Sequence, residues 1–430
     1  MQSQEALGNR RVSWTVRRRT AGMTVVAHSG LRALFHSAPF LRLWAIGSCV
    51  NTMRWFEVLA AALFTMDVTG SGLAVAVVSA ARTMPMFLFG AFAGVVTEAL
   101  NRKHVVVVGQ MATCLASATV AVLGWLGLAN PWHIALTATV SGIVWSTENA
   151  TRRRMVGECV EPAMVSRALA LDTMSNSVTR LFGPLLAGVL YQRYGLGGCF
   201  TASAVVYAFS SWLALGLRYR QETRRFVLSH VPRDLMEGLR YVRGDVVIGG
   251  VLAVTVVMNL LGFPYSALVA PIGRLIFHVS PSLIGILAAA EAFGAALGGA
   301  LLTTREPRID GRILMVGGSM LYLACVVSMP LMPLFWLSFG VLAFGGFGSA
   351  AFSNMQTSLI VLNTPVHIRS RLMGLLTVCI GMGPLGILLV GTIANFTGPR
   401  FAIDLVASTG FVLTTCIGIV WRRREAARRN

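Results

Sequence analysis

Residues 218–245 read RYRQETRRFVLSHVPRDLMEGLRYVRGD and form a long polar stretch near the middle of a largely apolar chain of 430 residues. Six long apolar stretches precede it and six follow it. Each is close to the roughly 20 residues that a helix needs to cross the hydrocarbon core of a membrane. The stretches are 41–66, 72–95, 104–127, 132–151, 168–191, 197–217, 246–268, 282–303, 312–329, 331–353, 372–394 and 399–420. The sequence therefore predicts an all-α membrane protein with twelve transmembrane helices in two six-helix bundles.

The composition and the placement of charge agree with this prediction. Apolar residues make up 55% of the chain and charged residues only 12%, which excludes an ordinary soluble enzyme. A net charge of +19 would suggest nucleic-acid binding in a soluble protein. Here 30 of the 36 cationic residues lie in the two tails and in alternate gaps between the apolar stretches. This bias predicts a multi-pass protein of the cytoplasmic (inner) membrane with both termini cytoplasmic. Anionic membrane lipids then account for the charge, without a nucleic-acid partner.

The same pattern divides the chain into five regions. Within the polar stretch, Leu235, Leu239 and Val242 recur at helical spacing among charged residues, which predicts a short amphipathic helix on the cytoplasmic membrane surface. The basic start of the chain is interpreted as a disordered tail or a lipid-surface segment, or Met23 is the true start. The regions are a basic N-tail (1–40), an N-terminal bundle (41–217), the linker with its amphipathic helix (218–245), a C-terminal bundle (246–420) and a basic C-tail (421–430).

Glycine and proline recur at matching places in the two halves. A Gly-Pro pair removes a side chain and a backbone donor together, so it favours a kink and lets another helix approach closely. The alternative is the ordinary enrichment of both residues in membrane helices. The predicted hinge and helix-packing residues are Pro85, Gly183, Pro184, Gly188, Gly383 and Pro384.

Four stretches carry a resemblance to a known family. They are WFEVLAAALFTMDVTGSGLAVAVVSAARTMPMFLFGAFAGVVTEALNRK (55–103), ENATRRRMVGECVEPAMVSRALALDTMSNSVTRLFGPLLAGVL (148–190), RDLMEGLRYVRGD (233–245) and RSRLMGLLTVCIGMGPLGILLVGTIA (369–394). Together they resemble the major facilitator superfamily, in particular the branch of enterobactin-type siderophore exporters and macrolide efflux proteins. The resemblance implies the major facilitator fold and secondary active transport of a small molecule by alternating access, with export as the direction.

The loop after the second stretch is similar to the superfamily's gate signature, with two departures. Gly94, Glu98 and Lys103 keep their places, but Ala99 and Asn101 stand where the family has arginine and glycine. The resemblance implies a cytoplasmic gate weakened by the loss of that arginine. The alternative is a solvated turn. The predicted gate residues are Gly94, Glu98, Arg102 and Lys103, together with Asp172, which stands near Arg167 and is either a gate or a loop contact.

Two carboxylates within the apolar stretches are candidates for proton coupling. A charge in the bilayer costs at least about 2.5 kcal/mol, so it faces a cavity or a partner. Glu57 lies three residues after Arg54 on one helix face, where the two could pair. Glu291 has no cation near it in sequence, and burial without a partner favours the neutral carboxyl that proton coupling needs. The alternatives are a structural ion pair for Glu57 and a carboxyl hydrogen-bonded to a neighbouring helix for Glu291.

Cationic and aromatic residues are the candidates for the substrate cavity. Guanidinium groups match carboxylate or phenolate oxygens, so an excess of them favours an acidic cargo. The alternative is that the arginines brace helices and that the tryptophans are core. The predicted cavity residues are Arg54, Arg82, Arg180, Trp55 and Trp145.

No sequence pattern indicates enzyme chemistry, and none indicates a cofactor or a metal. There is no Gly-x-x-x-x-Gly-Lys-Ser/Thr phosphate loop and no Cys/His cluster with metal-ligand spacing. We therefore expect a monomeric secondary transporter, not an enzyme, that exports a small siderophore-like or other acidic molecule in exchange for protons. The alternatives are a multidrug or macrolide-type efflux pump for hydrophobic xenobiotics and a non-pumping membrane sensor or partner protein.

Overall fold

A computed structural model of the protein describes residues 34–99, 101–217, 231–304 and 310–429. All regular structure in these ranges is helical. Most of the predicted N-tail and residues 218–230 of the predicted linker lie outside them. The N-terminal half contains α2 (Ala38–Thr69), α3 (Gly72–Ala99), α4 (Arg102–Trp125), α5 (Pro131–Glu158), the short η1 (Pro162–Met164) and α6 (Val165–Leu215).

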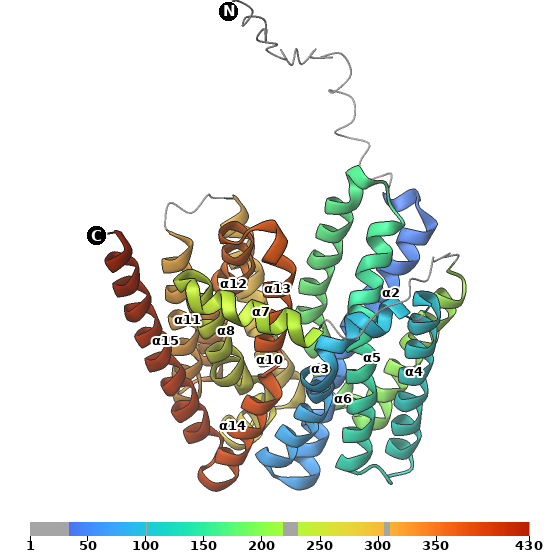
Figure 1. Ribbon diagram of the computed structural model, residues 1–430. Coiled ribbons are helices and arrows are strands. Elements are labelled where there is room, and N and C mark those ends of the chain that lie inside the picture. The colour runs from blue at the N-terminus through green and yellow to red at the C-terminus, as the bar shows by residue number, and fades with distance from the viewer. Residues whose placement is uncertain (1–33, 100, 218–230, 305–309, 430) are drawn as a thin grey trace, which may run out of the picture.

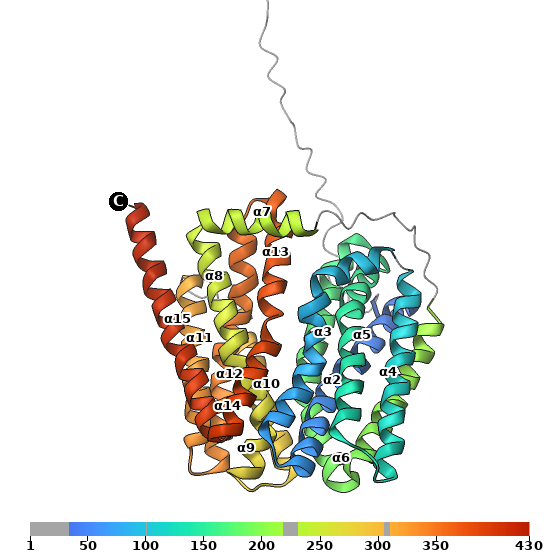
Figure 2. The ribbon, with the colours of Figure 1, turned by 60° about the horizontal axis from the view of Figure 1, so that its bottom comes forward.

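The C-terminal half follows the predicted linker (Figure 1). It contains α7 (Val231–Gly244), α8 (Val246–Val257), the π-helix η3 (Met258–Gly262), η4 (Phe263–Leu268), α9 (Val269–Leu275), α10 (Pro281–Thr304), α11 (Gly311–Ser328), η5 (Met329–Leu331), α12 (Phe335–Asn363), α13 (Val366–Ile380), α14 (Gly383–Thr397) and α15 (Pro399–Arg429). Figure 2 shows α7 lying across one end of this half. An ion pair of 2.7 Å between Glu237 and Arg371 joins α7 to α13.

All twelve predicted apolar stretches fall in helices, with local differences. Nine helical segments of the described residues are long and apolar enough to span a membrane. One of the nine contains all of α6, which joins the fifth and sixth stretches across a non-helical backbone at Gly195 (φ 60°). Helices α2 and α5 are not among the nine. The helix of the tenth predicted stretch, α12, begins at Phe335 and not at residue 331, because Pro330 and Pro333 interrupt the chain before it.

The two Gly-Pro pairs behave differently. Gly383-Pro384 interrupts the eleventh stretch, so that α13 ends at Ile380 and α14 begins at Gly383. Pro184 stays within the helical run of α6, as Pro85 does within α3. The glycines of α6 instead allow close approach of other helices. A Cβ on Gly183 would lie 2.7 Å from the Cβ of Trp55 in α2, and one on Gly188 would lie 3.1 Å from the Cα of Ser282 in α10.

The two halves converge at the end of the molecule that carries α9 and diverge toward the end that carries α7 (Figures 1 and 2). We call these the α9 end and the α7 end. Helix α6 contacts α10 across the halves, and α3 contacts α14. Gly188 and Gly391 lie at these contacts, the first against α10 and the second against Ala76 of α3. Backbones that approach so closely need small side chains on both helices.

This contact predicts a stability cost for filling it. Gly188→Leu is expected to lower the melting temperature of the purified protein by several degrees, because overpacking costs about 1–3 kcal/mol. Gly340→Leu is the matched control, since a Cβ at this exposed position in α12 meets nothing within 4 Å. Thermal unfolding in detergent measures both. Equal melting temperatures for the two variants would show that the α6–α10 contact does not need glycine.

Candidate functional site

A cavity of about 420 Å³ lies between the two halves. This volume falls within the range of small-molecule sites. Its walls come from α2, α3, α5 and α6 on one side and from η3, η4, α9, α10, α13 and α14 on the other. A smaller neighbouring cavity of about 170 Å³ shares part of its lining. All seven predicted cavity and coupling residues except Glu57 line one or both cavities: Arg54, Trp55, Arg82, Trp145, Arg180 and Glu291.

An ion pair crosses this cavity from one half to the other. Arg180 of α6 donates a hydrogen bond to Glu291 of α10. Glu291 is only 5% exposed, and its second oxygen accepts a hydrogen bond of 2.6 Å from Ser349 of α12. The expectation that Glu291 has no cationic partner is therefore wrong. The partner stands 111 residues away in the chain, so no local pattern could have identified it.

A second buried carboxylate is bound entirely within the N-terminal half. Glu57 of α2 is 1% exposed and pairs with Arg82 of α3 at 3.0 Å. Its other oxygen accepts a hydrogen bond of 2.8 Å from Ser117 of α4. The pairing of Glu57 with Arg54 that their spacing allowed does not form. Both side chains are on α2, but the charge of Glu57 is satisfied from two other helices.

Arg54 is held by aromatic rings and not by an acid. Its guanidinium carbon lies 3.6 Å from the ring centroid of Trp145 and 5.2 Å from that of Trp55. Among the described residues it forms no ion pair. Arg180 also lies over the ring of Trp55, at 5.3 Å. Cation–π contacts hold a guanidinium in place without neutralising its charge. Arg54 thus presents a positive charge to the cavity.

A polar cluster that sequence reasoning missed joins the halves at the α9 end. Arg274 of α9 forms a two-point ion pair with Asp67 of α2, with both N–O distances at 3.0 Å. Tyr191 of α6 donates a further hydrogen bond to Asp67, also at 3.0 Å. We call Asp67, Tyr191 and Arg274 the clasp. The one signal in the sequence was that Arg274 is cationic but lies in a gap on the side of the apolar stretches that carries few cationic residues.

The predicted gate residues that the structure describes lie at the α7 end and bind within the N-terminal half. Arg102 is buried and pairs with Glu158 at 2.6 Å. Asn101, one of the two departures from the signature, caps α4 by accepting a hydrogen bond from the backbone of Lys103. Gly94 and Glu98 lie in a part of α3 whose side chains the structure does not describe.

Asp172, predicted as a gate or loop contact, binds two arginines of the neighbouring helix α5. It is 3% exposed and binds Arg152 of α5 through both oxygens, at 2.5 and 3.3 Å. Arg153 lies 3.5 Å from the same carboxylate. Arg167 precedes Asp172 by five residues in α6, and helical geometry directs residues at this spacing to different faces. Asp172 thus ties α5 to α6.

One further buried acid was not singled out from the sequence. Glu148 of α5 is 2% exposed and accepts a hydrogen bond of 2.6 Å from Gln110 of α4. It lies near the end of a predicted span, where an acid is easily taken for a loop residue. In the ranges that the structure describes, no group of three His, Cys, Asp or Glu side chains could hold a metal ion.

A major facilitator family model described as "transmembrane secretion effector" matches residues 29–430. The chain belongs to this family. It is 24% identical over 350 residues to the multidrug efflux pump Tap of Mycolicibacterium fortuitum. This alignment covers 76% of this chain and 82% of that protein. It is 21% identical over 281 residues to the staphyloferrin A transporter of Staphylococcus aureus, over 63% of this chain and 67% of that protein. Macrolide efflux protein A of Streptococcus pyogenes is 21% identical over 394 residues, which is 89% of this chain and 94% of that protein.

Solved structures agree on the fold. A bacterial homologue of the human lysosomal transporter Spinster, inward-facing and unoccupied, has a TM-score of 0.71 at 14% identity and covers 90% of this chain and 98% of its own. The POT family transporter PepTSo has a TM-score of 0.70 at 10% identity, and the match covers 90% of this chain and 98% of that one. The predicted major facilitator fold and the predicted transport function are confirmed. The protein is a multi-pass membrane transporter.

Proposed function

We propose that this transporter exports a small acidic organic molecule from the cytoplasm in exchange for protons. The α7 end then faces the cytoplasm, and the protein lies in the inner membrane with both termini inside. The observation that carries the proposal is the cavity between the halves, where Arg54 has no acidic partner among the described residues and the Arg180–Glu291 pair crosses from one half to the other. One chain forms the whole cavity, so a monomer suffices. The proposal assigns the protein transport and no enzymatic reaction.

The charge and shape of the cavity support an acidic cargo. Of the arginines that line the two cavities, Arg82 pairs with Glu57 and Arg180 with Glu291, whereas Arg54 forms no ion pair among the described residues. The surplus charge is that of Arg54, and a carboxylate is its complement. Trp55 and Trp145 offer flat apolar surfaces beside it. The relative named as a staphyloferrin A transporter supports the siderophore-like class.

The ion pair between the halves supplies a means of coupling. While Arg180 binds deprotonated Glu291, the two halves are joined at the cavity. Protonation of Glu291 removes one charge and opens the pair. A cargo carboxylate at Arg180 opens it as well, by taking the place of Glu291. Either event frees the halves to rock about the cavity. The cavity then turns toward one side of the membrane with a proton bound and toward the other side with cargo bound.

Metabolite profiling of a deletion strain tests export directly. Cell extract and culture supernatant are compared with the parent strain under iron-replete and iron-starved growth. We expect an acidic metabolite to accumulate inside the deletion cells and to return to the supernatant when the wild-type protein is restored. No difference under either condition would contradict export of an endogenous acid.

Arg54 has a separable expected effect. Arg54→Gln is expected to raise the KM for the acidic cargo by about 10- to 100-fold, because a charge-assisted contact contributes roughly 1.5–3 kcal/mol. Arg54→Lys is expected to be intermediate, since lysine keeps the charge but not the planar group that stacks on Trp145. Initial transport rates over a range of cargo concentrations measure both. An unchanged KM in Arg54→Gln would remove Arg54 from the cargo site.

A second candidate function is efflux of hydrophobic xenobiotics. It is favoured by the apolar part of the cavity wall, which includes Val58, Met86, Phe263 and Ile387, and by the relatives named as a multidrug pump and a macrolide efflux protein. Drug susceptibility of the deletion strain distinguishes the two functions. Increased macrolide sensitivity without a retained acidic metabolite would favour this candidate.

A further inference from the structure

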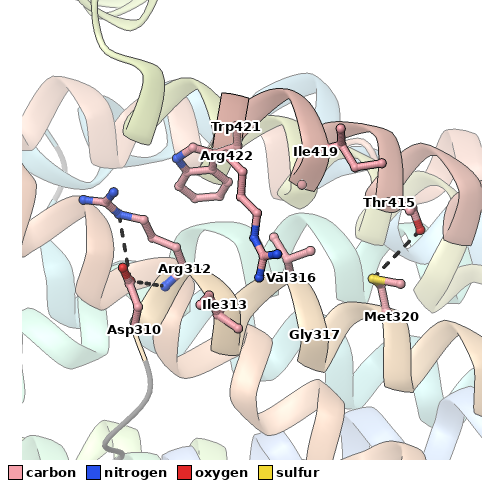
Figure 3. Close-up of a pocket in the computed structure, with 11 residues that line it drawn as sticks. Asp310, Arg312, Ile313, Val316, Gly317, Met320, Thr415, Ile419, Trp421 and Arg422 are labelled. Atoms are coloured by element: carbon pink, nitrogen blue, oxygen red, sulfur yellow. Dashed lines mark hydrogen bonds and ion pairs between the residues drawn. The ribbon is translucent and has the colours of Figure 1, made fainter. Parts of the chain in front are cut away.

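A third pocket lies on the outer side of the C-terminal half, apart from the cavity between the halves, which we call the cargo cavity. It has a volume of about 340 Å³ and is formed by the first half of α11 and by the part of α15 from Thr415 to Arg422 (Figure 3). None of its lining residues lines the cargo cavity. Helix α15 is at the outer edge of the half in Figure 1. We call this pocket the α11–α15 groove.

The groove is apolar along its length and basic at its mouth. Val316 and Met320 of α11 and Ile419 of α15 line the apolar part. Arg312, in the first turn of α11, and Arg422 of α15 also line the groove, and Figure 3 draws the Arg422 side chain reaching toward Val316. Asp310 lies beside Arg312, at 4.0 Å. This is the chemical profile of a phospholipid, which has an acyl chain below and an anionic phosphate above.

Two local features shape the groove. A Cβ on Gly317 would meet nothing within 4 Å, so this position leaves free space between the helices. Trp421 lines the groove with only 4% of its surface exposed, and its ring packs on Gly250 of α8. The indole Nε1 of Trp421 is buried and has no hydrogen-bond partner among the described residues. A buried indole N–H usually finds an acceptor. Because this nitrogen is not accessible from the groove, Trp421 contributes the face of its ring to the wall and not its N–H.

We propose that the α11–α15 groove binds one anionic phospholipid from the membrane leaflet at the α7 end. Arg312 and Arg422 bind the phosphate, and an acyl chain lies along Val316, Met320 and Ile419. The apolar part of the groove favours a lipid over a free phosphate ion. Ile313 and Ile419 are each 47% exposed at its side, so the groove is open to a lipid that enters laterally. Basic pockets between membrane helices bind anionic headgroups in this way.

Native mass spectrometry of the full-length protein in detergent tests the proposal. The probes are phosphatidylglycerol, phosphatidylcholine and inorganic phosphate. Wild type is expected to retain one phosphatidylglycerol and little phosphatidylcholine. The double variant Arg312→Gln with Arg422→Gln is expected to lower phosphatidylglycerol occupancy at least tenfold, because each charge-assisted contact is worth about that factor.

Two further variants separate the groove from general surface charge. Arg423→Gln with Arg424→Gln changes two exposed arginines of α15 that do not line the groove, and is expected to retain the lipid. Gly317→Leu fills the groove and keeps its charges, and is expected to lose the lipid. Equal loss in the Arg423/Arg424 variant, or retention in Gly317→Leu, would overturn the proposal. Displacement of the lipid by millimolar phosphate would assign the basic mouth to a free anion instead. The measurement does not depend on cargo or transport direction.

Discussion

Glu291→Gln is expected to lower proton-driven transport by at least a hundredfold while the protein remains folded. Glutamine has nearly the shape of glutamate and can keep the hydrogen bond from Ser349, but it cannot change charge. The inter-half pair with Arg180 is then permanently lost. The Arg180 side chain is 33% exposed to the cavity, so water limits the cost of leaving it unpaired. Transport rates with and without an imposed proton gradient measure the effect.

A charge exchange and a surface control make this result specific. Arg180→Glu combined with Glu291→Arg restores the pair and is expected to recover part of the coupling. Glu237→Gln removes an acid of α7 that pairs with Arg371 outside the cavity, and is expected to keep the wild-type response. A proton gradient that still accelerates transport by Glu291→Gln would refute the coupling role of Glu291.

Asp67→Asn is expected to open the α9 end of the protein. The clasp joins α2 to α9 through two contacts of 3.0 Å, and Asp67 also accepts the hydrogen bond from Tyr191. Its ion-pairing side chains are about one third exposed, so we expect a shift of about tenfold in the conformational equilibrium, equivalent to ~1.4 kcal/mol. Tyr191→Phe removes a single hydrogen bond and is expected to have a smaller effect.

Distances between spin labels measure this shift. Labels at Leu128 and Leu334, which are exposed in loops of the two halves at the α9 end, report the separation in a background without the native cysteines. Asp67→Asn is expected to populate a longer distance. Asp67→Arg with Arg274→Asp is expected to restore the shorter one. An identical distance distribution in wild type and Asp67→Asn would show that the clasp does not hold this end closed.

Sequence patterns predicted which charged residues are buried away from the lipid, but not which residues they pair with. Glu57 and Glu291 were identified as buried acids because a charge inside an apolar stretch must face protein or water. Their partners could not be identified, since Arg180 is 111 residues from Glu291 and Arg274 is 207 residues from Asp67. Helical periodicity fixes the face of one helix. The partner depends on how the two halves pack.

The Gly-Pro pairs show the same limit at a smaller scale. The identical dipeptide continues a helix at Gly183-Pro184 and separates two helices at Gly383-Pro384. Gly183 packs directly on α2, whereas the atom nearest to a Cβ on Gly383 is the carbonyl oxygen of Asn259, at 4.0 Å. The surroundings, and not the dipeptide, decide the outcome. The amphipathic helix α7 was predictable because its pattern is complete within one short segment.

Uptake by inverted membrane vesicles tests the central claim most directly. The vesicles are energised to be acidic inside, and a polycarboxylate siderophore and the hydrophobic cation ethidium are offered in parallel. We predict that wild-type protein accumulates the polycarboxylate, that Glu291→Gln does not, and that collapse of the gradient releases it. Accumulation of ethidium without the polycarboxylate would contradict the account and assign the cavity to cationic xenobiotics.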